Sequence, residues 1–73
     1  MRRFVLHRDV DPRGVSGTGV VAEGIQFTDG VVVVRWCGDW ASTVVWDSLA
    51  DALHVHGHGG STRVDWQDPL ERN

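Results

Sequence analysis

Short runs of β-branched and aromatic residues alternate with turn-forming clusters along most of the chain. Val, Ile, Thr and the aromatic residues favour strands, whereas Gly, Pro, Asn and Asp interrupt them. The pattern predicts five strands, at residues 3–8, 20–27, 31–36, 42–46 and 61–66. Residues 47–54 instead place apolar side chains three and four positions apart, behind Asp47 or Ser48 as N-cap. This segment is predicted to form one or two helical turns before the last strand.

Three local features refine the strand prediction. Asp29-Gly30 lies between two β-rich runs and predicts a tight hairpin turn, whose central residues need positive φ. The strand at 20–27 has apolar residues at both odd and even positions, a conflict that a bulge at Gly24 would repair. Four consecutive valines at 31–34 predict a strand buried on both faces.

These elements predict a mainly-β fold, a small five-stranded antiparallel barrel of the SH3-like kind, with one short helical turn before the last strand. Barrel closure would remove the sheet edges that otherwise promote aggregation. An OB-like barrel is the second choice, because it needs longer strands and a longer helix between the third and fourth. The chain has 73 residues, enough for one core, so residues 1–73 are expected to form a single domain.

Composition narrows the classes of function. The chain is 41% hydrophobic and 23% charged, as is common in soluble globular proteins, and it has no apolar run long enough for a membrane span or a secretory signal. We therefore expect a cytoplasmic protein without a membrane partner. A net charge of −3 argues against a general nucleic-acid binder. The single cysteine, Cys37, excludes an internal disulfide and is expected to act as a small buried hydrophobe at a strand end.

A set of short motifs runs from about Phe4 to about Asp68. The motifs are GTGVVAEG at 17–24, Asp29-Gly30, Arg35-Trp36, HGHGG at 56–60, Thr62-Arg63 and Trp66. In these motifs the chain resembles a family of small proteins found in actinobacteria and their phages. The resemblance implies a short stand-alone protein carried by a phage, and it supplies no catalytic residue.

Three histidines at alternate positions form the candidate metal site. In an extended segment His54, His56 and His58 would project to one side, and His7 could add a fourth nitrogen ligand. The glycines that separate and follow them favour a turn in which the imidazoles hydrogen-bond to the backbone. A small metal-binding or ligand-binding module that uses this segment is therefore the alternative function, and the main prediction contains no metal or cofactor.

We do not expect an enzyme, because the interior of so small a barrel is filled by its own side chains and leaves no active-site pocket. The chain contains four tryptophans, more than such a core can enclose, so at least one indole is expected at the surface. Trp36 and Trp46 fit the core best, whereas Trp40 lies in a loop and Trp66 precedes a polar tail.

Exposed tryptophan beside arginine is typical of the centre of a protein interface. The predicted protein-binding residues are therefore Trp40, Arg35, Trp66 and Arg63, and the predicted partner is a host or phage protein or a second copy of the chain. The alternative is that all four tryptophans pack inside the fold or hold loops in place.

Overall fold

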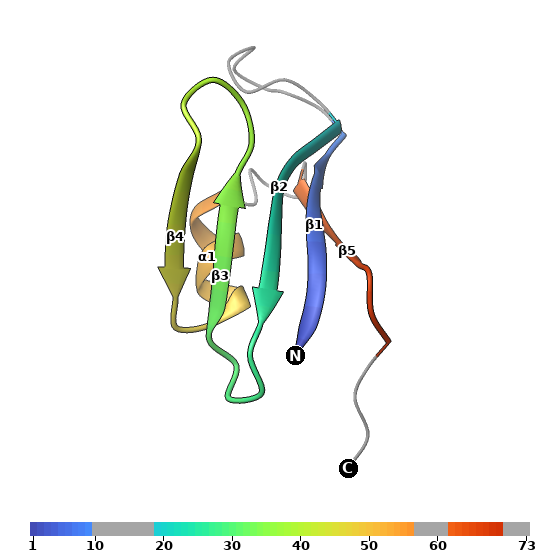
Figure 1. Ribbon diagram of the computed structural model, residues 1–73, viewed down its shortest axis with the longest axis vertical. Helices are drawn as coiled ribbons and strands as arrows, with labels where there is room; N and C mark the ends of the chain where they lie inside the picture. The colour runs from blue at the N-terminus through green and yellow to red at the C-terminus, as the bar shows by residue number, and fades with distance from the viewer. Residues whose placement is uncertain (10–18, 57–61, 70–73) are drawn as a thin grey trace.

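The computed structural model describes residues 1–9, 19–56 and 62–69 of the chain. Five strands form one sheet, and a helix lies behind it in the view of Figure 1. The elements are β1 (Arg2–Arg8), β2 (Gly19–Gln26), β3 (Val32–Trp36), β4 (Ser42–Trp46), α1 (Leu49–His56) and β5 (Thr62–Trp66). All five predicted strands are confirmed, each with ends within one residue of the prediction.

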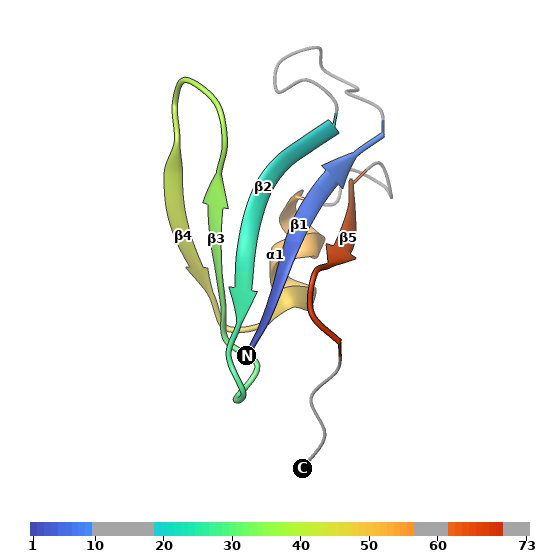
Figure 2. The same ribbon diagram turned by 45° about the vertical axis from the view of Figure 1, so that its right-hand side comes forward.

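The strand order in the sheet is β4-β3-β2-β1-β5, and all neighbours are antiparallel. The mainly-β prediction with a helix before the last strand is thus confirmed. The sheet is open, however, with β4 at one edge and β5 at the other, so the SH3-like closure is not confirmed. Figures 1 and 2 show α1 behind the sheet, on the way from one edge strand to the other. In a closed barrel, strands of the opposite wall would cover this face of the sheet. Here α1 covers it.

The core lies between the sheet and α1. Its buried members are Phe4, Leu6, Val21, Ala22, Val32, Val34 and Ala52, with Trp36, Trp46, Leu49, Leu53, Val64 and Trp66 packed against them. On β3, Val32 and Val34 are 0% exposed, whereas Val33 between them is half-buried. The expectation that the valine strand is buried on both faces is therefore wrong, because α1 covers only one side of the sheet.

The bulge in β2 lies at Val21 and not at Gly24. Leu6 pairs with Ala22 and His7 with Val20, so Val21 is the additional residue, and Gly24 pairs regularly with Phe4. Gly24 is needed for another reason. A Cβ at this position would come within 2.7 Å of Cε2 of the Phe4 ring, which lies against the glycine backbone.

The hairpin between β2 and β3 is confirmed, but its loop has three residues, Thr28 to Gly30. The Phe27 N–H donates to the Val31 carbonyl at 2.8 Å, and the Gly30 N–H donates to the Phe27 carbonyl at 3.0 Å. Gly30 has a φ of 97°, the left-handed conformation that completes such a loop.

Helix α1 begins two residues later than predicted. The Ser48 hydroxyl accepts a hydrogen bond from the Asp51 N–H at 3.1 Å, which makes Ser48 the N-cap. Within the described ranges, no helix has the length and apolar character needed to cross a membrane.

Candidate interaction surface

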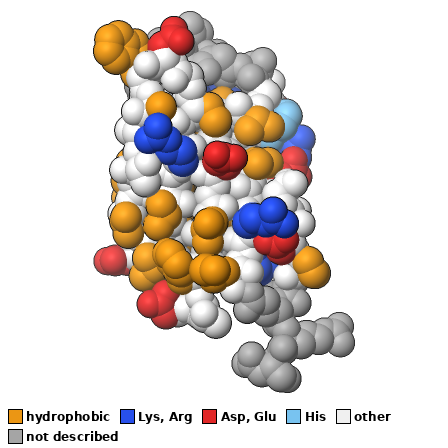
Figure 3. All heavy atoms as spheres, in the orientation of Figure 1, with side chains coloured by type: hydrophobic (Ala, Val, Ile, Leu, Met, Phe, Trp, Pro, Cys, Tyr) orange, Lys and Arg blue, Asp and Glu red, His pale blue; other side chains and the backbone are white. Residues whose placement is uncertain are grey.

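The side of the sheet opposite α1 carries alternating side chains that no other described element covers. We call it the open face. Its residues are Arg3, Val5 and His7 on β1, Glu23 and Ile25 on β2, Val33 and Arg35 on β3, Thr43 and Val45 on β4, and Arg63 and Asp65 on β5. Figure 3 views the molecule from this side, where a band of hydrophobic side chains lies beside positive and negative side chains.

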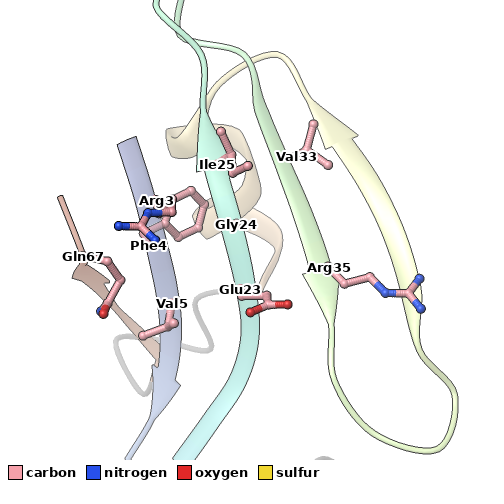
Figure 4. A pocket seen from close by; sticks show the side chains of 9 residues that line it. All are labelled: Arg3, Phe4, Val5, Glu23, Gly24, Ile25, Val33, Arg35 and Gln67. Carbon is pink, nitrogen blue, oxygen red and sulfur yellow. The ribbon is translucent and has the colours of Figure 1, made fainter. Parts of the chain in front are cut away.

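Strand register arranges the centre of the open face into two rows. A charged row crosses the sheet through Val5, Glu23, Arg35 and Thr43, which are partners on neighbouring strands. An aliphatic row beside it contains Arg3, Ile25, Val33 and Val45. A shallow hollow of about 400 Å³ lies between residues of both rows (Figure 4). The Gly24 backbone forms part of the wall of this hollow.

The charges nearest the β5 edge are paired within the molecule. The Arg3 guanidinium donates to Asp68 at 2.8 and 3.0 Å, and the Arg3 backbone N–H donates to the same carboxylate at 2.8 Å. These hydrogen bonds lower the pKa of Asp68 to about 2. Arg63 lies 3.4 Å from Asp9 and 3.1 Å from Asp65.

The charges at the centre of the sheet are arranged differently. Arg35 Nη1 donates to the Thr43 hydroxyl at 3.0 Å, and Figure 4 shows its side chain directed toward β4. Glu23, its partner on β2, therefore lies beside an arginine that is turned away from it. Within the described part of the chain, neither Glu23 nor Arg35 forms an ion pair.

Trp40 is 94% exposed in the loop between β3 and β4, which confirms the expectation of a surface indole. Trp66 instead lies on the helix side of the sheet. Its ring makes an edge contact with Phe4 at a centroid distance of 5.4 Å, and the Arg2 guanidinium lies 3.8 Å over it.

The four predicted binding residues therefore do not form one cluster. Arg35 and Arg63 share the open face but lie on β3 and β5, with β2 and β1 between them. Trp40 lies in the loop beyond them, and Trp66 lies on the other side of the sheet.

A second concave region, which we call the Trp groove, lies beside the Trp40 loop. It is lined by Arg8, Val21, Trp36, Trp40, Ser42, Val44 and His56, together with residues 37–39. Arg8 is only 3% exposed, and its Nε donates to the Thr62 hydroxyl at 3.2 Å. Sequence reasoning missed this buried arginine, although Phe4, Leu6 and Arg8 alternate on β1 and thus share the core side of the strand.

His54 and His56 do not lie in the extended segment that the alternative metal site requires. His54 and His56 belong to α1, and residues two apart on a helix do not face each other. The His56 ring lies 4.8 Å from that of Trp36 and 5.6 Å from that of Trp46. His58 lies outside the described residues, while His7 is on β1 with Nδ1 3.2 Å from Asp9. No three His, Cys, Asp or Glu residues in the described ranges are grouped closely enough to hold a metal ion.

Cys37 is exposed, so the expectation of a buried thiol is wrong. Strand β3 ends at Trp36, and the chain turns away from the core at the next residue. The Cys37 N–H still donates to the Val21 carbonyl at 2.9 Å, which holds the start of the loop to β2.

Comparison with known proteins places the chain in a family. Neither the curated proteins nor the solved structures contain a match. A family model described as Acb5 phage protein matches residues 1–68, which include every strand and the helix. The chain therefore belongs to the Acb5 phage protein family.

Proposed function

We propose that this phage protein is not an enzyme and that it acts by binding another protein through the Trp40 loop. The exposure of Trp40 carries the proposal. An indole that is 94% exposed contributes little to the core, whereas in an interface it buries a large area and can donate one hydrogen bond. Tryptophan is also among the residue types most enriched at the energetic centres of interfaces.

The surroundings of Trp40 suit a docking site. The Trp groove beside it has apolar walls from Val44 and Trp36, and polar groups from Ser42 and Arg8. Interfaces combine such an apolar centre with a few directed polar groups. Arg35 is on the adjacent β3 strand, but its side chain lies on the open face and does not line the groove, so it is not part of this site.

The partner class in this proposal is a protein of the host or of the phage, met in the cytoplasm of an infected actinobacterium. Affinity capture of the tagged chain from host cells, with quantitative mass spectrometry, tests it. We expect Trp40→Ala to weaken binding by about 2 kcal/mol or more and therefore to lower the amount of partner recovered. The Tm of this variant should stay within a few degrees of the wild-type value.

The matched control is Val55→Ala, which removes an exposed apolar side chain from α1 and should retain the partner. If Trp40→Ala recovers every specific partner at the wild-type level, the site is not at this loop. If it unfolds the protein, Trp40 holds the loop in place and the interaction must use another surface.

The buried arginine favours one second candidate, a ligand-binding module that includes His56. Arg8 is 3% exposed and lines the Trp groove together with His56. A guanidinium held in this way suits an anionic group. Calorimetric titration with inorganic phosphate should give heat that Arg8→Gln abolishes. Titration with zinc tests whether the ligand is a metal ion. The comparison is a variant in which His54, His56 and His58 are replaced by alanine. No heat in either titration rejects this candidate.

A further inference from the structure

The open face has an uneven distribution of paired charges. Toward β5, Arg3 and Arg63 are each held by carboxylates of the same molecule. At the centre, Glu23 and Arg35 are neighbours on β2 and β3, and neither is ion-paired within the described residues. The unused opposite charges therefore lie side by side in the middle of an uncovered sheet.

This arrangement is complementary to itself. Consider a two-fold axis that runs along the open face between β2 and β3, parallel to both strands. It places Arg35 of a second copy over Glu23 of the first, and Glu23 of the second over Arg35 of the first. The same axis places Val33 of one copy over Ile25 of the other, because Ile25 and Val33 are partners in the adjacent row. An interface of this kind uses one patch twice, as two-fold dimers do.

We propose that two copies of the chain pack open face to open face about this axis and form a homodimer. Packing of two sheets with nearly aligned strands is a standard arrangement in sandwich proteins. The proposal goes beyond partner binding at the Trp40 loop and does not depend on it, because Trp40 lies outside the strands that would meet.

Apolar contact and charge make different contributions to this interface. Val45 is 65% exposed and Ile25 is 38% exposed, so the aliphatic row has surface that a second copy would remove from water. The two symmetry-related Glu23–Arg35 pairs contribute mainly to alignment and specificity, because like charges that meet in a shifted alignment repel.

Substitutions that reverse the charge of Glu23 or of Arg35 test the dimer in the purified protein. We expect wild type to sediment as a dimer at micromolar concentration. Glu23→Arg and Arg35→Glu should each raise the dimer dissociation constant by about tenfold or more, because each places like charges opposite one another. An equimolar mixture of the two variants should recover the dimer, because the arginines of one copy then face the glutamates of the other.

Asp39→Arg is the matched control, since it makes the same change of charge in the exposed loop and should sediment like wild type. Circular dichroism establishes that each single variant is folded, and Glu23→Gln, which removes the charge without repulsion, provides a milder variant. A wild type that remains monomeric, a Glu23→Arg variant that still dimerises fully, or a folded mixture that does not recover the dimer each overturns the proposal. None of these outcomes bears on Trp40, so the two proposals fail independently.

Discussion

Two glycines of this chain are required for different physical reasons. At Gly24 the space for a side chain is occupied by the Phe4 ring, whereas the backbone has no positive φ. At Gly30 the space is empty, with nothing within 4 Å of a built Cβ, and φ is 97°. One position is therefore limited by packing and the other by backbone conformation.

Gly24→Ala is expected to lower the free energy of unfolding by roughly 1–3 kcal/mol, because the added methyl must displace the Phe4 ring from the core. Urea unfolding measures the loss. In a double-mutant cycle, Phe4→Leu should relieve part of it, since the two side chains then no longer compete. Strictly additive losses would show that the methyl group is accommodated elsewhere.

Gly30→Val is expected to cost about 1–2 kcal/mol, because a β-branched residue is disfavoured at positive φ. Gly30→Asn should cost less, since Asn is several-fold enriched in this region. Thermal unfolding of the two variants compares them. Equal melting temperatures for Val and wild type would mean that the loop adopts another conformation in solution.

Trp46 provides the contrast with Trp40. It packs against the buried core and against the His56 ring at 5.6 Å, so Trp46→Ala should destabilise the fold by roughly 3–5 kcal/mol. Chemical denaturation of this variant, beside Trp40→Ala, measures the difference. A loss at Trp46 no larger than that at Trp40 would contradict the assignment of Trp46 to the core.

At the scale of elements, the local sequence pattern predicted which strands and helix the chain forms, but not how these elements are arranged in the sheet. Each strand is a run of β-favouring residues between turn formers, and such runs can be recognised without knowledge of the fold. The position of the bulge could not be recognised, because Val21 is the additional residue only in relation to its neighbours on β1. The exposure of Val33 could not be recognised from the sequence either, since it depends on which face of the sheet α1 covers.

The segment after β5 is held to β1 by the Arg3–Asp68 pair, which predicts a response to acid. Hydrogen bonds from Arg3 lower the pKa of Asp68 from 3.8 to about 2 in the folded state. A lowered pKa favours folding above pH 4, and the contribution is lost as the pH falls toward 2. The difference in Tm between wild type and Asp68→Asn should therefore narrow over this range. A difference that is constant between pH 5 and pH 2 would show that the pair does not hold in solution.

At the scale of the whole molecule, some residues of the candidate surfaces could be predicted from the sequence and others could not. The exposure of Trp40 was predictable, because Gly38-Asp39 and Ala41-Ser42 flank it and place it outside any strand. The position of Glu23 beside Arg35 was not predictable, because it depends on the register between β2 and β3. Arg8 differs from this pair, because its alternation with Phe4 and Leu6 on β1 marks it as core-facing, and only its hydrogen-bond partner Thr62 lies far along the chain.

The position of β1 has a consequence for the time course of folding. Strand β1 precedes the other four strands of the sheet in sequence and lies between β2 and β5. Its pairing with β5 joins residues more than fifty positions apart, such as Arg8 and Thr62. Strands β2, β3 and β4 can pair as successive hairpins while the chain is still being made. The β5 side of β1 has no partner until residues 62–66 have left the ribosome. Contacts of such long range slow folding, so the β1–β5 pairing is expected to form later than the hairpins β2–β3 and β3–β4.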